Sequence, residues 1–351
     1  MADVTVHGAG IFGLTVAWAC ARRGASVRVI DPMGPGAGAS GGLVGALAPH
    51  VPENWNAKKQ LQFDSLVMAE AMWPEVARLA GTDPGYARSG RLQPIPDEAA
   101  LALAEARTET ARELWQGRFT WDIVPQDGYA PYAAAPTGLL IRDTLSARLH
   151  PRRAIAALAR ALANLGVEIC KDGAATGRQV WATGTAGLEE ISGVLGADVG
   201  NGVKGQAALL DFDGRALPQL FTDGLHIIPH GDGTTAIGST SERDYTDPDG
   251  TDARLDALIE KARALCPVLG GADVLDRWAG LRPRARSRAP MLGHHPTRPG
   301  AFIANGGFKI GFGMAPVIGE IMADLVLDGR DRIPDSFRAA GSLPKERPPQ
   351  E

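Results

Sequence analysis

The chain has 351 residues, of which 44% are hydrophobic, so it can bury a core and is long enough for two domains. Its 36 Lys and Arg nearly balance its 40 Asp and Glu, which excludes a strong general attraction to nucleic acid or to an acidic membrane. The three cysteines are widely spaced, so we expect neither disulfides nor a metal site. We see no recognisable signal peptide and no segment apolar enough to span a membrane, and we therefore expect a cytoplasmic protein.

The first 31 residues predict a nucleotide-binding unit. A short strand near Val4 is followed by Gly8, Gly10 and Gly13 in a GxGxxG pattern, an apolar helix and a second strand that ends at Asp31. In this order the glycines allow a tight turn, a close approach to a pyrophosphate and close helix packing, and the acid can bind a ribose. An acid here suits a free 2′-OH, as in FAD or NAD. The alternatives are incidental glycines and an ordinary acid at a strand end.

A second glycine-rich stretch, "GPGAGASGGLVGALAPH" at 34–50, follows at once. A simple NAD domain has no obvious use for more flexible backbone at this point. A larger cofactor has such a use, because more phosphate and a flavin ring must be approached by backbone. This stretch therefore favours FAD, with a flexible surface loop as the alternative.

These residues resemble the D-amino-acid oxidase and glycine oxidase family of flavoenzymes, in which the acidic strand end is followed by an Ala-Ser-rich turn. The resemblance extends over most of the chain and is weakest from about 100 to 140. Family members usually have a hairpin between 169 and 180 that supports the adenine, whereas this chain has only a short connection there. The other resembling segments are 71–76, 148–169, 178–187, 203–212, 225–240 and 280–293.

The resemblance implies a non-covalently bound FAD and a set of backbone and side-chain contacts to it. These residues lie in the first turn, the Ala-Ser turn, a strand end at 182–184 and a late glycine-rich loop. They are Gly8, Gly10, Ile11, Phe12, Gly13, Asp31, Ala39, Ser40, Gly41, Gly45, Ala182, Thr183, Gly184, Gly306, Gly307, Phe308, Lys309, Ile310 and Gly311.

The implied fold class is α/β: a Rossmann-like FAD-binding domain of the GR2 type with an inserted α+β substrate domain built on a mixed or antiparallel sheet. The FAD-binding domain is expected at 1–80, 145–205 and 276–351. The substrate-binding domain is expected at 81–144 and 206–275. Within it, 251–267 predicts an amphipathic helix whose Leu255, Leu258, Ile259 and Ala262 face the core.

The late loop "GGFKIGFGMAP" at 306–316 predicts a strand–loop–helix element with Pro316 near the first turn of the helix. The helix N-terminus and the loop N–H groups would stabilise negative charge on a reduced flavin. The resemblance makes Arg282 the main ligand of a substrate carboxylate. Lys309 and His226 stand where the family has an arginine and a tyrosine, so both anchors are altered. A surface lysine and a hydrogen-bonded strand histidine are the alternatives.

The resemblance implies an FAD-dependent oxidase or dehydrogenase that oxidises the C–N bond of a small amino acid or amine, with molecular oxygen or another electron acceptor as its second partner. Glycine, a D-amino acid and an N-substituted glycine all fit, and a homo-oligomer is compatible. A second interpretation is removal of a carboxymethyl group from a modified tRNA wobble uridine, with the basic run from Arg282 to Arg298 binding RNA. A third is a nucleotide-binding module without catalysis.

Overall fold

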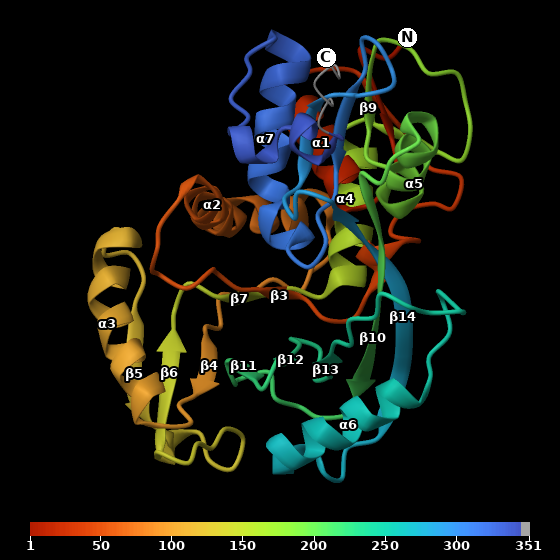
Figure 1. Ribbon diagram of the computed structural model, residues 1–351. Helices are drawn as coiled ribbons and strands as arrows, with labels where there is room; N and C mark the ends of the chain where they lie inside the picture. Colours follow the sequence, from red (N-terminus) through yellow and green to blue (C-terminus); the bar gives the residue numbers. More distant parts are fainter. Residues whose placement is uncertain (345–351) are drawn as a thin grey trace, which may run out of the picture. The chain divides into compact units, whose positions relative to one another are not determined.

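A computed structural model describes residues 1–344 (Figure 1), and these residues form two compact units. The first unit contains 1–41, 155–203 and the chain from Leu281 onward, and the second contains 42–154 and 204–280. Residues 42–80, 145–154, 204–205 and 276–280 therefore group with the second unit, although we expected them in the FAD-binding domain. The assignment of an FAD-binding and a substrate-binding domain stays a prediction.

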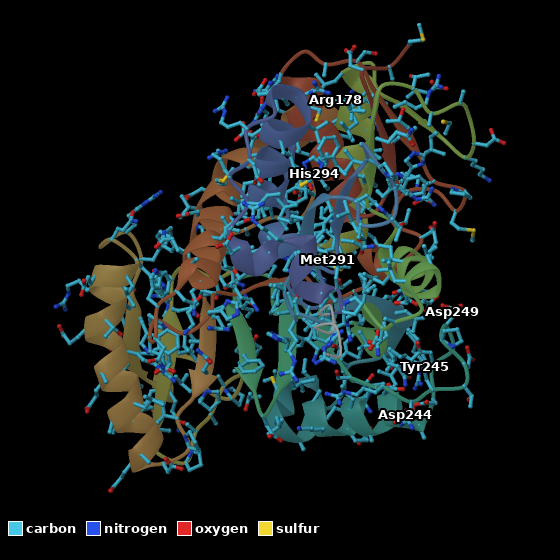
Figure 2. The ribbon with its side chains drawn as sticks, turned by 45° about the horizontal axis from the view of Figure 1, so that its top comes forward. Arg178, Asp244, Tyr245, Asp249, Met291 and His294 are labelled. Atoms are coloured by element: carbon cyan, nitrogen blue, oxygen red, sulfur yellow. The ribbon has the colours of Figure 1, made fainter. Side chains whose placement is uncertain are left out.

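The first unit is built on a six-stranded sheet in the order β15-β16-β9-β1-β2-β8. The strands pair in parallel except β15, which is antiparallel to β16. This arrangement confirms the predicted Rossmann-like class, since the strand at Val4 lies in the middle of a mostly parallel sheet. The strands are β1 (Val4–His7), β2 (Val27–Ile30), β8 (Glu168–Cys170), β9 (Arg178–Trp181), β15 (Met291–His294, with both end residues labelled in Figure 2) and β16 (Phe302–Asn305).

Helices α1 and α7 pack side by side in this unit (Figure 1). Glycine permits the close approach: a Cβ added at Gly319 would lie 2.7 Å from the carbonyl oxygen of Thr15. None of the helices in the described part of the chain is both long and apolar enough to span a bilayer. The helical elements here are α1 (Ile11–Arg22), η1 (Ala39–Gly41), α4 (Pro151–Asn164, which begins in the second unit), α5 (Gly184–Leu195), α7 (Gly311–Asp328), η4 (Asp335–Phe337) and η5 (Ala339–Ser342).

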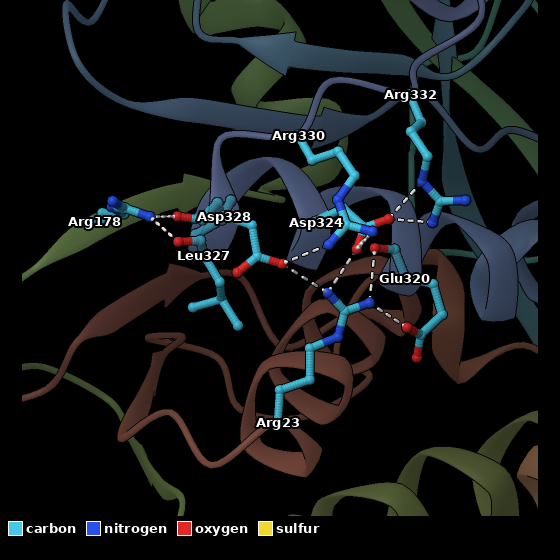
Figure 3. A network of polar contacts seen from close by, with 9 residues as sticks. Arg23, Arg178, Glu320, Asp324, Leu327, Asp328, Arg330 and Arg332 are labelled. Atoms are coloured by element: carbon cyan, nitrogen blue, oxygen red, sulfur yellow. Dashed lines mark hydrogen bonds and ion pairs between the residues drawn. The ribbon is translucent and has the colours of Figure 1, made fainter.

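An ion-pair network joins the end of α1 to α7 (Figure 3). Its centre is Asp324, whose side chain is only 4% exposed and accepts hydrogen bonds from Arg23, at 2.7 Å, and from Arg332. Arg23 also pairs with Glu320. Burial by itself would raise the pKa of the Asp324 carboxyl, but the hydrogen bonds from the two arginines outweigh it and lower that pKa.

We expect Asp324→Asn to lower the free energy of unfolding by about 2 kcal/mol, because the negative charge is lost and one of the two accepting oxygens becomes an NH2 group that faces an arginine. Asp328→Asn is the matched control: its carboxylate is 48% exposed, so its ion pairs contribute about 1 kcal/mol at most. Since the folded pKa of Asp324 is lowered, its contribution is present above the unfolded pKa and disappears as the pH falls through the folded one. Denaturant unfolding at pH 7 and pH 3 measures this. Equal losses for the two variants would contradict it.

The second unit contains an eight-stranded sheet in the order β14-β10-β13-β12-β11-β4-β6-β5. It is mixed, because β11 and β4 pair in parallel whereas β10–β13, β13–β12, β12–β11, β4–β6 and β6–β5 pair antiparallel. The unit boundaries fall inside β10 and β14. The strands are β4 (Arg91–Pro94), β5 (Trp121–Pro125), β6 (Leu139–Asp143), β10 (Gly200–Leu210), β11 (Gln219–Thr222), β12 (Leu225–Pro229), β13 (Thr235–Gly238) and β14 (Val274–Ala285), with β3 (Ala46–Leu47) and β7 (Ala147–Arg148) as a separate pair.

Three longer helices complete this unit. The predicted amphipathic helix is confirmed as α6: Leu255, Ile259 and Ala262 are buried in the core that covers the sheet, and Leu258 packs against them. The loop before it carries Asp244, Tyr245 and Asp249 along the outer edge of the unit (Figure 2). The helical elements are α2 (Ala57–Ala80), α3 (Glu98–Leu114), η2 (Gln126–Gly128), α6 (Ala253–Leu265) and η3 (Pro267–Leu269).

The short connection predicted before β9 runs from 171 to 177 and carries no strand. Next to it the Trp181 ring stacks on His7, with centroids 4.0 Å apart, and the guanidinium carbon of Arg298 lies 3.8 Å from the centroid of the same indole. Arg298 also pairs with Glu190. Trp181 and Arg298 also line a hollow of about 430 Å³ on the first unit.

Candidate functional site

The first glycine turn lies against the end of β9. The amide of Gly8 donates to the Ile30 carbonyl at 2.8 Å, and the Ala182 amide donates to the His7 carbonyl at 2.7 Å. Gly8 has a φ of +103°, and a Cβ there would lie 2.4 Å from the Ala182 carbonyl oxygen. Gly13 is equally constrained, since its Cβ would lie 1.9 Å from the Gly8 carbonyl oxygen. Two predicted cofactor segments, the first turn and 182–184, are thus brought together.

Asp31 holds this turn in shape. One carboxylate oxygen accepts from the Ala9 amide at 2.7 Å, and the other accepts from the Met33 amide at 2.9 Å. An ionised carboxylate has about four acceptor positions, so these two bonds leave capacity for a ribose diol. The structure therefore adds a local structural role for Asp31, while its cofactor role stays a prediction.

The Ala-Ser turn forms the short helix η1 beside the N-terminus of α1. The Ser40 hydroxyl accepts a hydrogen bond from the Ile11 amide at 3.0 Å, and a Cβ at Gly10 would lie 3.3 Å from that hydroxyl. Gly41 is explained by a turn contact, because a Cβ there would lie 2.4 Å from the Gly36 carbonyl oxygen. Ser40 thus orders the start of α1, which sequence reasoning did not anticipate.

The loop at 306–310 also packs against the start of α1. A Cβ at Gly307 would lie 2.8 Å from the ring of Phe12, and one at Gly311 would lie 3.5 Å from Ile11. Buried Asn305 links this loop to the end of β9: its amide group donates to the Gly184 carbonyl at 2.9 Å, and its oxygen accepts from the Gly306 amide at 2.7 Å. Sequence reasoning missed Asn305. Its position at the end of a buried strand was the available signal.

The helix at this loop begins earlier than expected. We placed its first turn near Pro316, but α7 begins at Gly311 and Pro316 lies inside it, so that expectation is wrong. The reason is packing: the segment from Gly313 onward is buried, which outweighs the low helix propensity of its glycines. The glycine-rich loop is therefore shorter than predicted, and the helix N-terminus lies directly after Lys309 and Ile310.

The helices that begin at these turns have N-termini without caps. For α1, α5 and α7, the N-cap residue itself gives no side-chain hydrogen bond and no acidic residue lies in the first turn; in α1 the Ile11 amide donates to the Ser40 hydroxyl instead. Three other helices, α2, α3 and α6, are capped by Asn56, Asp97 and Asp252. Uncapped N–H groups and the helix dipole favour an anion. The residues present at these turns therefore fit the phosphates and electron-rich edge of a flavin dinucleotide.

Cationic side chains gather beside the same loop. The Phe308 amide donates to the Pro283 carbonyl at 2.9 Å, and Arg284 forms a β-bridge with Gly307, so β14 lies along the loop. Arg282 is two residues from Arg284 and therefore points to the same side of the strand. Burial lowers the pKa of the Lys309 ammonium, and the charge of Arg282 lowers it further. Arg282 and Lys309, predicted separately, are thus close enough to interact.

Two predicted site residues, His226 and Gly45, belong to the second unit. His226 lies on β12, where its ring is 4.6 Å from that of Phe221 between centroids, and its role toward Arg282 and Lys309 stays a prediction. Gly45 is packed against a neighbouring segment, since a Cβ there would lie 1.7 Å from the Leu149 carbonyl oxygen. That contact alone requires glycine, so its cofactor role also stays a prediction.

The second unit contains a histidine that sequence reasoning missed. His230 is fully buried, and its Nε2 lies 3.1 Å from the carbonyl oxygen of Leu43 in the glycine-rich segment after η1. Burial, together with the nearby His150, lowers the pKa of His230 to about 4. A neutral ring protonated at Nε2 donates this bond and orders the segment. The "PHGDG" turn offered no signal that separated His230 from an exposed turn residue.

A sequence model of the DAO family, described as FAD dependent oxidoreductase, matches residues 3–325. The chain belongs to this family. It is 30% identical over 373 residues to a glycine oxidase of Pseudomonas putida, with 95% of this chain and 96% of that protein covered.

Among solved structures, glycine oxidase from Geobacillus kaustophilus matches with a TM-score of 0.81 at 22% identity and covers 96% of this chain and 98% of its own. Iminodiacetate oxidase from Chelativorans sp. BNC1 matches with a TM-score of 0.82 at 22% identity, covering 95% and 98%. At these identities the two structures show the fold alone. The family membership makes the chain an FAD-dependent oxidoreductase, in agreement with the uncapped helices and crowded glycine turns of the first unit.

Proposed function

We propose that this oxidoreductase oxidises the C–N bond of a small amino acid or amine that carries a carboxylate. Glycine, a D-amino acid and an N-substituted glycine are the candidates. The observation that carries the proposal is that β14, which contains Arg282, pairs with the 306–310 loop, which contains Lys309, in a family whose glycine oxidases act on amino donors. The loop contacts Phe12 at the first glycine turn, where we place the cofactor.

The chain's own residues would bind and orient the substrate. Arg282 holds the carboxylate through charge-assisted hydrogen bonds, which fixes the Cα–H for transfer. Arg282 and Lys309 together disfavour a substrate ammonium, so they lower the pKa of the amine and increase its neutral fraction. FAD, when bound, accepts the hydride, which carries two electrons. His226 is proposed as a further contact to the carboxylate.

The proposed reaction removes two electrons and two hydrogens from the substrate. The substrate loses the Cα hydride and the N–H proton, and the C–N single bond becomes an imine. Water adds to the imine and gives a carbonyl compound and an amine. Dioxygen or another two-electron acceptor removes the electrons. A cytoplasmic location stays a prediction from cysteine usage.

The tRNA alternative is less well supported. This alternative requires the arginines of the basic run that ends at Arg298 to bind RNA phosphates. Arg298 instead pairs with Glu190 and lies over the Trp181 ring. We therefore treat modified tRNA only as a substrate to test if small amines fail.

The direct test is the visible spectrum of the purified holoenzyme under anaerobic conditions. We expect the flavin absorbance to bleach on addition of glycine, sarcosine or a D-amino acid, because the two electrons stay on the enzyme without an acceptor. An L-amino acid of the same size is the control. A flavin that no small amine bleaches would contradict the proposal, and bleaching by carboxymethyl-modified tRNA would then support the alternative.

A further inference from the structure

Three cationic side chains share one small region of the first unit. Arg284 and Lys309 both lie beside the Phe308 ring: the guanidinium carbon is 5.7 Å and the ammonium nitrogen 5.6 Å from its centroid. Arg282, on the same side of β14 as Arg284, acts electrostatically on Lys309. Phe308 itself has a φ of 43°, a conformation that is uncommon for a bulky residue and typical of functional sites.

Two of these three cationic side chains, Arg284 and Lys309, have no carboxylate partner in the described part of the chain. Other arginines nearby in the sequence do: Arg277, on the same strand, pairs with Asp256 at 2.6 Å. Like charges close together destabilise one another; burial lowers the pKa of Lys309 most, and the charge of Arg282 lowers it further.

One carboxylate bound by Arg282 would leave Arg284 and Lys309 without a counter-charge. A neutral substituent on the substrate, such as the methyl group of sarcosine, would also shield them from water, which is costly for a charged group. A second carboxylate removes both penalties. It would accept from Lys309 as a point charge and from Arg284 through its planar fork.

We propose that the preferred substrate is a small amine with two carboxylates, one bound by Arg282 on the reacting carbon and the other by Arg284 and Lys309. This inference rests on the proposed function and specifies its substrate class. The second carboxylate can come from the nitrogen substituent, as in an iminodicarboxylate, or from the carbon side chain, as in a dicarboxylic amino acid. The first gives a 2-oxo acid and an amino acid after imine hydrolysis, and the second gives a 2-oxo diacid and ammonia.

Matched substrate pairs test this on the holoenzyme. Sarcosine and iminodiacetate differ only by the second carboxylate, as do D-alanine and D-aspartate. We expect at least one dicarboxylate to exceed its monocarboxylate partner about 100-fold in kcat/KM. We expect Arg284→Met and Lys309→Met each to reduce that ratio about tenfold or more. Arg286→Met, an exposed arginine just beyond the strand, should leave the ratio unchanged.

Binding without turnover provides a second readout. Oxydiacetate and methoxyacetate replace the amine of iminodiacetate and sarcosine by an ether oxygen, so neither can be oxidised at a C–N bond. Oxydiacetate should perturb the flavin spectrum with a Kd about 100-fold lower than methoxyacetate, and Arg284→Met should abolish most of the difference. If sarcosine or D-alanine is oxidised and neither dicarboxylate is preferred, the inference is overturned while the proposed function stands. If no amine reduces the flavin, both fail.

Discussion

Arg282→Met is expected to lower kcat/KM for the preferred amine about 100-fold to 1,000-fold while the protein keeps its flavin. The charge-assisted hydrogen bonds from Arg282 would be lost, and removing one partner of such a pair typically costs about 2–5 kcal/mol. Each factor of ten corresponds to about 1.4 kcal/mol. Stopped-flow reduction of the flavin, with substrate varied, separates weaker binding from slower hydride transfer.

Arg277→Met is the matched control for this experiment. Arg277 lies on the same strand, but its guanidinium is 41% exposed and pairs with an exposed Asp256. Exposed pairs of this kind contribute about 1 kcal/mol or less, so this variant should keep wild-type kcat/KM. Retention of kcat/KM within threefold by Arg282→Met would show that another group binds the carboxylate.

Gly8→Ala is expected to destabilise the protein by about 3–5 kcal/mol and to prevent FAD binding. A side chain at its φ of +103° is strained by about 1–2 kcal/mol. The added Cβ would also lie 2.4 Å from the Ala182 carbonyl oxygen, so the turn and the end of β9 must move apart. These two segments carry predicted cofactor contacts. Flavin content after purification and thermal unfolding measure both effects.

Gly24→Ala separates backbone strain from crowding. Gly24 also has a positive φ, +84°, but no atom lies within 4 Å of an added Cβ. We expect this variant to lose about 1 kcal/mol and to bind FAD normally. If the two variants behave alike, the contact with Ala182 has no special importance for the cofactor site.

The fold of the first unit was largely predictable because its signals are local. The GxGxxG turn, the strand at Val4 and the end of β2 each depend on a few adjacent residues, and the structure confirms all three elements. The family resemblance then implied a Rossmann-like domain, whose strands pair mostly in parallel. The beginning of α7 was not predictable in the same way, because burial rather than propensity makes its glycines helical.

The unit boundary after Gly41 also depends on contacts between distant residues, which the sequence does not reveal. Residues 42–80 follow the nucleotide-binding turn directly, so the sequence suggested that they belong to it. In the structure, α2 packs within the second unit: Phe63 meets the edge of the Phe119 ring, and Arg88 donates to the Leu66 carbonyl at 2.8 Å. Contacts between residues so far apart in sequence cannot be inferred from periodicity.

The candidate site shows which kinds of residue sequence reasoning finds. Glycines that require close approach were identified correctly as special, since no other residue fits at Gly8 or Gly13. Asn305 and His230 were missed because their importance lies in bonds to backbone groups of distant segments. Arg284 lies in the basic run from Arg282 to Arg298, where the sequence alone does not separate it from solvent-exposed arginines. Its place beside Phe308 became clear from the loop that pairs with β14.

The uncapped N-termini of α1, α5 and α7 link the stability of the protein in the cell to its supply of cofactor. If FAD binds at these three helix ends, as we propose, the folded state gains stability by mass action as the free cofactor concentration rises. Newly made chains in a flavin-poor cell would open more often and meet proteases in that state. The supply of riboflavin would then set the abundance of this enzyme as well as its activity.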